Sequence, residues 1–366
     1  MWALNALSFS QLININQYQI LGKLIFDMTV SSKFLRALFI GFLSLTFVLP
    51  MADVQAQNNQ PAKSKQQAKK QEKAPKKAKK VRTTTTRKKA SESADEKRPS
   101  FASAMGLRGN HDSLNLKSSV ALIVDRQTHE VLFEKNTHAS LPIASITKLM
   151  TSLVVMDAQL PLNETLVIHQ EDVNAYPGRA RSRVTEHAQM TREQALLLAL
   201  MSSENRAAHA LGRNYPGGLS AFVDAMNAKA KMLGMTQSKF ADPTGLSSEN
   251  VSSPEDLTRL VEAAYQHKTI REFSTRPDYS LMIGKREQKF INTNRLVRAS
   301  DMDIGLQKTG YISAAGRCLV MQAKVQGRDV VMVFLDSVGK LSRFADAVRV
   351  KEWLESNPNP TPLRRL

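Results

Sequence analysis

The stretch that most constrains this chain is Ser145-Ile146-Thr147-Lys148, which opens the most apolar helix-like segment after residue 56. Residues 146–156 place apolar side chains on nearly every side of a helix, the pattern of a helix that is buried all round. Ser145 and Lys148 are three positions apart, so they project from one face of its first turn. A helix N-terminus favours negative charge that develops on a serine oxygen, and desolvation with a second cation nearby lets a lysine act as base. The sequence therefore predicts Ser145 as an acylated nucleophile and Lys148 as its base.

A second Ser-x-x-Lys match, Ser337-Val338-Gly339-Lys340, shows that the pattern alone is weak. This copy follows a strand-like run and contains a glycine, so we expect a strand-to-helix turn. A turn offers no rigid platform for a nucleophile. Context therefore favours Ser145.

Ser203-Glu204-Asn205 lies where two helical segments meet, and a helix junction can hold a hydroxyl and an amide firmly. A similar triplet, Ser248-Glu249-Asn250, falls in a loop. Ser203 could equally serve as an N-cap of the second helix, which is a common use of serine at such a position. We take Ser203 and Asn205 as candidate site residues and keep the N-cap as the alternative.

Lys308-Thr309-Gly310 occurs once and ends the strand-like segment 304–309. Gly310 would let a substrate backbone approach an edge strand closely. An ordinary turn at a strand end is the alternative interpretation. The order of all three motifs along the chain raises the value of each.

The formal charge of +18 is concentrated in one segment rather than spread over the chain. Residues 57–100 contain 15 Lys and Arg against 4 Asp and Glu, which leaves 36 against 29 elsewhere. Almost nothing in this segment can be buried, so we expect a disordered linker. No aromatic residues interleave the charges, which argues against specific nucleic-acid binding. A soluble spacer is one interpretation, and electrostatic association with anionic envelope polymers is the other.

The N-terminal region has the features of an export signal. A mostly apolar run at 34–49 follows Lys33 and is followed by Val54-Gln55-Ala56, a small-x-small cleavage pattern. Residues 1–27 are an awkward preface to such a signal, so translation could begin at Met28. A retained membrane anchor is the alternative. The single cysteine, Cys318, lies in a strand-like run and is expected to be a small buried hydrophobe rather than a nucleophile.

Folded structure is expected from Ser118, with two strands at 120–125 and 131–134. Helices are expected at 191–201, 205–212, 219–233 and 254–265, strands at 304–309, 317–325 and 330–335, and a last helix at 341–355. Strands at both ends with helices between predict an α/β fold, more closely an α+β sandwich, whose antiparallel sheet closes from N- and C-terminal segments around a mainly helical insert. The expected division is an N-terminal extension and signal (1–56), a basic linker (57–117), a catalytic domain (118–356) and a flexible tail (357–366).

Taken together, the motifs resemble the three signatures of penicillin-binding proteins and serine β-lactamases. The wider match is to low-molecular-mass DD-peptidases related to D-alanyl-D-alanine carboxypeptidases, and the endopeptidase type looks most similar. The resemblance covers roughly residues 118–355. It is carried by Ser145-x-x-Lys148, Ser203-Glu204-Asn205-Arg206, Asp242-Pro243-Thr244-Gly245-Leu246, Lys308-Thr309-Gly310-Tyr311 and Ala315-Gly316-Arg317-Cys318.

The resemblance implies a β-lactamase/DD-peptidase-like fold and acyl transfer on a D-alanyl peptide. Ser145 would attack the carbonyl, Lys148 would take its proton, and Ser203 with Lys308 would relay a proton to the leaving amine. Asn205, Thr309 and Gly310 would contact substrate, and the backbone N–H groups of Ser145 and Tyr311 would form the oxyanion hole. No metal or other cofactor is needed for this chemistry.

The implied activity is hydrolysis of D-alanyl cross-links between peptidoglycan stem peptides in the periplasm, with covalent inhibition by β-lactams. Carboxypeptidases of the family usually continue into a β-rich domain with a C-terminal membrane anchor, which the segment after residue 355 does not resemble. A carboxypeptidase remains the alternative, with a β-lactamase or an inactive wall-binding protein less favoured. Arg317 and Arg343 are possible but unsupported readers of a substrate carboxylate.

Overall fold

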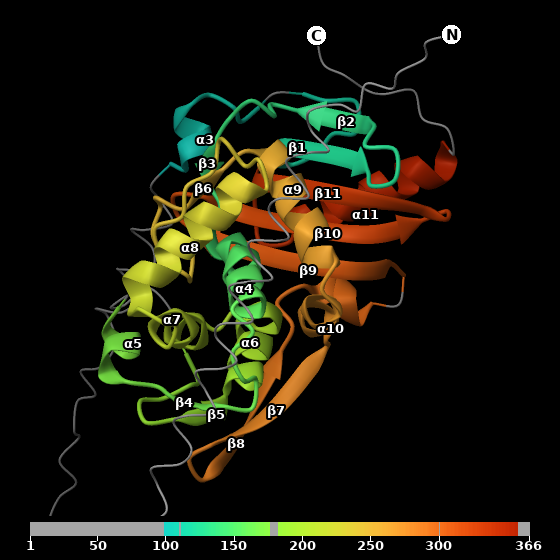
Figure 1. Cartoon of the computed structure of the whole chain (residues 1–366). Coiled ribbons are helices and arrows are strands. Elements are labelled where there is room, and N and C mark those ends of the chain that lie inside the picture. The colour runs from blue at the N-terminus through green and yellow to red at the C-terminus, as the bar shows by residue number, and fades with distance from the viewer. Residues whose placement is uncertain (1–98, 110, 176–181, 300, 358–366) are drawn as a thin grey trace, which may run out of the picture. The chain divides into compact units, whose positions relative to one another are not determined.

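A five-stranded antiparallel sheet forms from segments near both ends of the domain (Figure 1). The computed structural model describes residues 99–109, 111–175, 182–299 and 301–357. In spatial order the strands are β2 (Val131–Lys135), β1 (Ser118–Asp125), β11 (Arg328–Ser337), β10 (Gly316–Val325) and β9 (Asp303–Ile312). The N-terminal strand β1 pairs with the C-terminal β11, with Val120 opposite Leu335. The expected closure of the sheet from both halves of the chain is therefore present.

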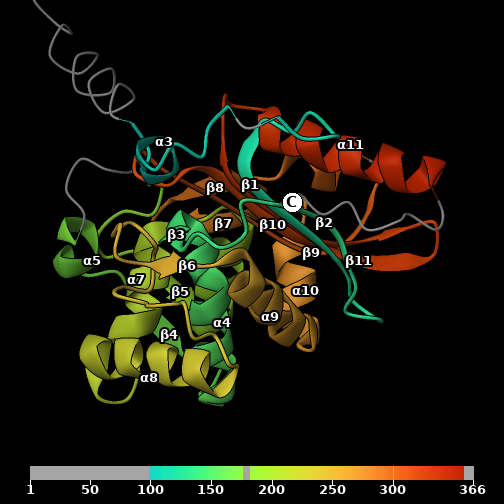
Figure 2. The same ribbon diagram turned by 90° about the horizontal axis from the view of Figure 1, so that it is seen from above.

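Helices cover both faces of this sheet (Figure 2). The helices of the described residues are α3 (Phe101–Ala104), α4 (Lys148–Asp157), α5 (Gln170–Asn174), α6 (Arg192–Met201), α7 (Asn205–Arg213), α8 (Gly218–Met232), α9 (Pro254–Tyr265), α10 (Lys268–Thr275) and α11 (Ser342–Ser356), with 3₁₀ turns at Ala144–Thr147 and Arg295–Arg298. Helix α11 packs on one face against β1, β10 and β11, whereas α9 and α10 pack on the opposite face.

Alternate residues of β1 feed two separate cores, because successive side chains of a strand point to opposite faces. Val120 and Leu122 join the core under the helical insert, while Ala121 and Ile123 join the core beneath α11. Every residue of β1 is buried. This explains why the strand is a continuous apolar run in the sequence rather than an alternating one.

Within the helical insert, α4 is the central element. Eight of its residues, Lys148–Val155, are buried, and it contacts α6, α7, α8 and α9. The expected all-round burial is therefore observed. The first turn is tighter than expected: Ala144–Thr147 forms a 3₁₀ turn, so Ser145 precedes the α-helix and Lys148 begins it.

Three short two-stranded sheets complete the fold, and the sequence analysis did not anticipate them. Their strands are β3 (Leu141–Pro142) with β6 (Val251–Ser252), β4 (Thr165–Val167) with β5 (Gln189–Thr191), and β7 (Asp278–Ile283) with β8 (Arg286–Ile291). In the described part of the chain, no helix is long and apolar enough to cross a membrane.

Ordered structure begins before the expected boundary at Ser118. Phe101, in α3, donates its backbone N–H to Ala314 O at 2.9 Å, and Arg108 forms an ion pair with Asp336 at 2.6 Å. A nearly buried ion pair of 2.8 Å also joins Asp112 to Lys135. These contacts attach residues 99–109 and 111–117, which lie within the expected linker, to the domain. The expected signal, the possible start at Met28 and most of the basic linker lie outside the described residues.

Candidate active site

The centre of the site is Ser145 with Lys148. Both side chains are buried, and Lys148 Nζ lies 3.0 Å from Ser145 Oγ. The tight turn that carries Ser145 requires an unusual backbone at Ala144, where φ is 49°. A non-glycine residue in this region costs about 1 kcal/mol or more, and such strain is concentrated at functional sites. The predicted nucleophile and base are thus brought within hydrogen-bonding distance.

Lys148 has neutral partners at its nitrogen and carboxylates further away. Its Nζ donates to Asn205 Oδ1 at 2.7 Å and to the backbone oxygen of Thr244 at 2.6 Å. Burial lowers the pKa of Lys148 to about 7, against the opposing charges of Asp242 and Glu204. A lysine with this pKa is substantially neutral near pH 7, so it can accept the proton of Ser145.

Ser203 and Lys308 form a second pair, because Lys308 Nζ donates to Ser203 Oγ at 3.0 Å. Lys308 is buried and also donates to the backbone oxygen of Thr309 at 3.0 Å. Burial, followed by the charges of Lys148 and Arg343, holds the pKa of Lys308 well below its ordinary value. Two buried amines therefore face this centre, each next to a serine hydroxyl.

The N-cap alternative for Ser203 is wrong. The N-cap of α7 is Glu204, whose side chain makes no capping bond, and Ser203 lies in the left-handed region with φ of 60°. The turn between α6 and α7 thereby directs the hydroxyl of Ser203 to Lys308. Pattern matching could not have found this conformation, because it depends on contacts across the site.

Lys308-Thr309-Gly310 lies inside β9 rather than at its end, since the strand continues to Ile312. Strand β9 is the edge of the sheet, so only β10 pairs with it. Gly310 is required here because a Cβ would lie 2.8 Å from Ile143 O and 3.2 Å from Ser145 N. The absent side chain allows the edge strand to approach the backbone of the nucleophile. Thr309 Oγ1 is held 2.6 Å from Thr293 Oγ1, a partner that sequence reasoning missed.

The loop at 242–250 positions the amine of Lys148 through the backbone oxygen of Thr244. Asp242 accepts hydrogen bonds from Thr244 N at 2.6 Å, Gly245 N at 2.8 Å and Asn250 Nδ2 at 2.6 Å. Burial by itself would raise the pKa of Asp242, but the hydrogen bonds from Thr244, Ser247 and Gly245 keep it below its ordinary value. A fixed carboxylate thus shapes the turn that presents Thr244 O to Lys148. The motif Asp242-Pro243-Thr244-Gly245-Leu246 was visible in the sequence, but its support of the base was not.

Glu204 is a buried carboxylate at the same centre, and sequence analysis gave it no role. Its two oxygens accept from Ser182 Oγ at 2.7 Å and from Arg183 N at 3.4 Å. Burial raises the pKa of Glu204, against those hydrogen bonds and the charges of Lys148 and Arg206. In turn, the negative charge of Glu204 raises the pKa of Lys148 against the effect of burial.

These features agree with what similarity to known proteins shows. The family model described as D-alanyl-D-alanine carboxypeptidase matches residues 108–339. The chain belongs to this family. A D-alanyl-D-alanine endopeptidase of Pseudomonas aeruginosa is 46% identical over 243 residues, which cover 66% of this chain and 78% of that protein. A D-alanyl-D-alanine endopeptidase of Escherichia coli is 44% identical over 250 residues with the same coverage.

Solved structures place the fold in the same group. A penicillin-binding protein from Listeria monocytogenes, in its cefotaxime-bound form, is 27% identical with a TM-score of 0.60, and the match covers 66% of this chain and 98% of that one. The expected β-lactamase/DD-peptidase-like architecture is therefore confirmed.

In this member of the D-alanyl-D-alanine carboxypeptidase family, the second Ser-x-x-Lys motif and the second Ser-Glu-Asn triplet lie outside the catalytic centre. Ser337 ends β11 on the far side of β10 from the catalytic edge strand, and Lys340 is exposed. Asn250, of the second triplet, is buried and hydrogen-bonded to Asp242. Within the residues that the structure describes, the side chain of Ser145 is hydrogen-bonded to Lys148 and to neither of these motifs.

Cys318 is buried in β10, as expected, and burial raises the pKa of its thiol to about 12. A thiol in that state is not a nucleophile near neutral pH. Among the residues that the structure describes, no group of three or more His, Cys, Asp or Glu side chains is placed to hold a metal ion.

Proposed function

We propose that this protein is a serine DD-peptidase that cleaves D-alanyl cross-links of peptidoglycan through an acyl-enzyme, a D-alanyl-D-alanine endopeptidase. The observation that carries the proposal is the buried Lys148 amine, 3.0 Å from Ser145 Oγ and with a pKa of about 7. Family membership gives the substrate class, and the two endopeptidases at 44% and 46% identity favour the cross-link as the bond that is cut.

Acylation begins when Ser145 Oγ attacks the D-alanyl carbonyl carbon and its proton passes to neutral Lys148. The carbonyl oxygen, now carrying the negative charge, accepts hydrogen bonds from the backbone N–H groups of Ser145 and Tyr311. Collapse of this intermediate breaks the C–N bond, and the leaving amine takes a proton delivered through Ser203 and Lys308. The product of this half-reaction is an ester between Ser145 and the D-alanyl group.

Hydrolysis of that ester completes the cycle. Lys148 is neutral again at this stage, because the proton that it took from Ser145 has gone through the relay to the leaving amine. Water adds to the ester carbonyl carbon and gives its proton to Lys148, which then returns a proton to Ser145 Oγ as the ester bond breaks. Asn205 orients the substrate amide while its Oδ1 stays bonded to Lys148, and Thr309 contacts the polar group beside the scissile bond. Gly310 keeps the edge strand close enough for a substrate backbone to align with it. A β-lactam would acylate Ser145 by the same first step.

Digestion of purified muropeptides tests the proposal. Loss of cross-linked dimers with release of monomers supports the endopeptidase. Release of only the terminal D-alanine from monomers would instead support a carboxypeptidase, the activity in the description of the matching family. Labelling by a fluorescent penicillin should disappear in Ser145→Ala, and labelling that survives this change would refute the assignment of the nucleophile. Rapid turnover of a chromogenic cephalosporin would indicate a β-lactamase.

The same proposal includes the site of action. The relatives' activity on cell-wall peptides is consistent with work outside the cytoplasm, and we propose export to the periplasm with cleavage after Ala56. N-terminal sequencing of the mature protein checks the cleavage. We further propose that the basic segment 57–100 associates with anionic envelope polymers, and salt-sensitive sedimentation with purified cell walls, lost on deletion of 57–98, checks that interaction.

A further inference from the structure

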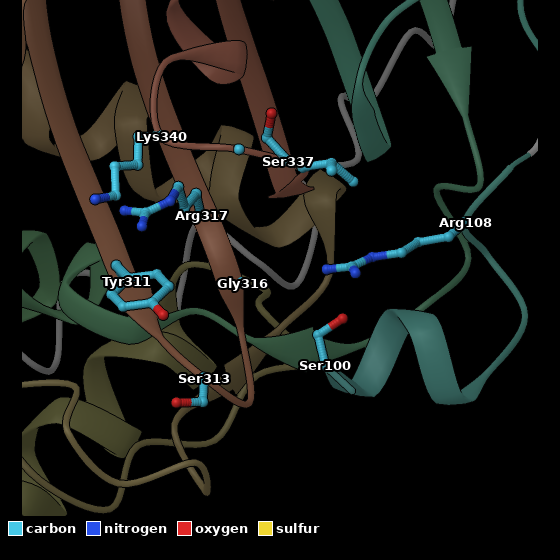
Figure 3. A pocket seen from close by; sticks show the side chains of 10 residues that line it. Ser100, Arg108, Tyr311, Ser313, Gly316, Arg317, Ser337 and Lys340 are labelled. Carbon is cyan, nitrogen blue, oxygen red and sulfur yellow. The ribbon is translucent and has the colours of Figure 1, made fainter. Parts of the chain in front are cut away.

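A basic pocket lies beside the catalytic strand, and the mechanism above uses none of its side chains (Figure 3). Its volume is about 320 Å³. The end of β9, the start of β10, the segment after β11 and the residues around α3 form its walls. The lining residues that matter here are Ser100, Arg108, Tyr311, Arg317, Ser337 and Lys340.

The pocket carries two cations without a matching acid. Within the described part of the chain, neither Arg317 nor Lys340 forms an ion pair. The neighbouring carboxylate of Asp336 is already bound by Arg108 at 2.6 Å and by Ser119 Oγ at 2.7 Å. Figure 3 shows Arg317, Lys340 and Tyr311 grouped on one side of the pocket, with Arg108 on the other. Uncompensated positive charge around a hollow favours an anionic ligand.

A buried hydroxyl with no partner marks the same pocket. Ser337 is only 2% exposed, and its Oγ has no hydrogen-bond partner in the described structure. Buried polar atoms are normally satisfied, so the hydroxyl of Ser337 is available to hydrogen-bond a ligand in this pocket. Ser337 and Lys340 are the two ends of the second Ser-x-x-Lys motif, for which catalysis has no use.

The positive charge of Arg343, a further arginine near the pocket, also favours an anionic ligand. Burial, followed by the charge of Arg317, lowers the pKa of Arg343 to about 10. A like-charge pair of this kind is relieved when an anion binds beside it. The ring of Tyr311 holds the Arg317 guanidinium 4.2 Å from its centroid, which orients the planar fork.

Tyr311 connects this pocket to the catalytic centre. It follows Gly310, which abuts the backbone of Ser145, and its own side chain lines the pocket. A peptide aligned along β9 therefore passes the mouth of the pocket. The scissile D-alanyl carbonyl of a cross-link is an amide, so the free carboxylates of the substrate lie elsewhere on its two stem peptides, and a guanidinium fork is well matched to such a group.

We propose that this pocket binds a free carboxylate of the cross-linked stem-peptide substrate, held by Arg317 and Lys340 and by the hydroxyl of Ser337. The proposal rests on the DD-peptidase function proposed above. Under this proposal the pocket is a specificity subsite for cross-linked peptides, because a cross-link brings carboxylates from two stem peptides. Amidation of one stem peptide at a time identifies whether the donor or the leaving stem peptide supplies the carboxylate.

The test uses the double variant Arg317→Gln/Lys340→Gln, with Lys324→Gln, an exposed lysine further along β10, as the matched control. The substrates are a synthetic cross-linked dimer, the same dimer amidated on the carboxylates of either the donor or the leaving stem peptide, and a short acyl-D-Ala-D-Ala peptide whose only carboxylate is its C-terminus. We expect the KM for the free dimer to rise about tenfold or more in the double variant, with little change in kcat. Reaction with the short peptide and with penicillin should stay within about twofold of wild type, because neither one carries the stem-peptide carboxylate assigned to the pocket.

Amidation supplies the second readout. Amidating the strand that contacts the pocket should raise the KM of wild type and of Lys324→Gln by a similar factor, but not that of the double variant. Ser337→Ala should raise the KM for the free dimer by a smaller factor. An unchanged KM in the double variant would overturn the proposal. Equal amidation penalties in wild type and double variant, or an equal loss on the short peptide, would overturn it as well.

Failure of the underlying function gives a different result. If wild type cleaves no dimer and no short peptide, the DD-peptidase proposal itself fails, and the pocket assignment falls with it. Cooperative thermal unfolding at the wild-type temperature shows that the variants are folded, which we expect because Arg317 is only half-buried and Lys340 is exposed.

Discussion

Replacing Glu204 with glutamine should shift the pH profile of Ser145 acylation to lower pH. The charge of Glu204 raises the pKa of Lys148, whereas burial lowers it, and the balance is about 7. Glutamine keeps an oxygen that can accept from Ser182 Oγ but removes the negative charge. The ammonium form of Lys148 then loses one of its two stabilising carboxylates, so its pKa falls. Asp242, whose pKa is held low, remains charged throughout and is the carboxylate that persists.

The size of the effect is bounded by the fraction of Lys148 that is neutral. With a pKa of about 7, this fraction is about one half at pH 7 and about one tenth at pH 6. Any downward shift can therefore raise acylation by at most about twofold at pH 7 and about tenfold at pH 6. Above about pH 8 almost all of the lysine is neutral already, so no gain is expected there. Burial raises the pKa of Glu204, so the difference should shrink again at still lower pH as the wild-type carboxyl takes up a proton.

The measurement is the second-order rate of labelling by a fluorescent penicillin between about pH 5.5 and 9, the range that brackets the pKa of Lys148. Glu193→Gln, which removes an exposed carboxylate from the first turn of α6, is the control and should leave the profile in place. A profile that does not move, or that moves to higher pH, would refute the argument that neutral Lys148 is the base and that Glu204 sets its pKa. A uniform loss of rate at every pH would instead show that Glu204 acts by holding Ser182 and Arg183.

Two further substitutions separate catalysis from stability. Gly310→Ala would place a Cβ 2.8 Å from Ile143 O and 3.2 Å from Ser145 N, so the edge strand or the nucleophile must move. Penicillin acylation should fall by about 100-fold while urea unfolding stays cooperative, and a rate within about threefold of wild type would contradict the proposed close approach. Asp346→Ala removes the buried carboxylate that accepts from Ser118 N at 2.8 Å and Ser118 Oγ at 2.6 Å. Urea denaturation should show a loss of about 3 kcal/mol in the free energy of unfolding with the acylation rate of folded protein unchanged, and a loss below about 1 kcal/mol would count against a structural role.

The sequence predicted elements best where local signals agree with tertiary contacts. Helix α9 was expected at residues 254–265 and forms as Pro254–Tyr265, because Ser253 caps it and Pro254 fits its first turn. Strand β9 extends past the motif where it was expected to end, since pairing with β10 continues to Ile312 opposite Gly316. The short strands β3 to β6 have too few residues for a periodic pattern, so they form only where the fold brings partners together.

In the site, the sequence predicted the residues of the three motifs but not the neighbouring groups that hold their side chains in place. Lys148 is hydrogen-bonded to Ser145 and Asn205. Lys308 is hydrogen-bonded to Ser203, so residues of all three motifs take part in such pairs. The positive φ of Ser203, the Thr244 carbonyl at Lys148 and the burial of Glu204 come from packing between distant segments. No local pattern encodes these features, because each depends on the path of another part of the chain.

The pairing of β1 with β11 makes assembly of the catalytic site depend on contacts between distant parts of the sequence. The bond between Ser119 and Asp336 spans 217 positions, and the two amine–serine pairs cannot both form until β9 has joined the sheet. Contacts this distant form late and slowly in a growing or refolding chain. A chain lacking its last strands would hold the nucleophile without the second amine. Covalent penicillin labelling therefore reports completed folding. The labelled fraction of a sample measures the fraction of molecules in which the N- and C-terminal strands of the sheet have paired.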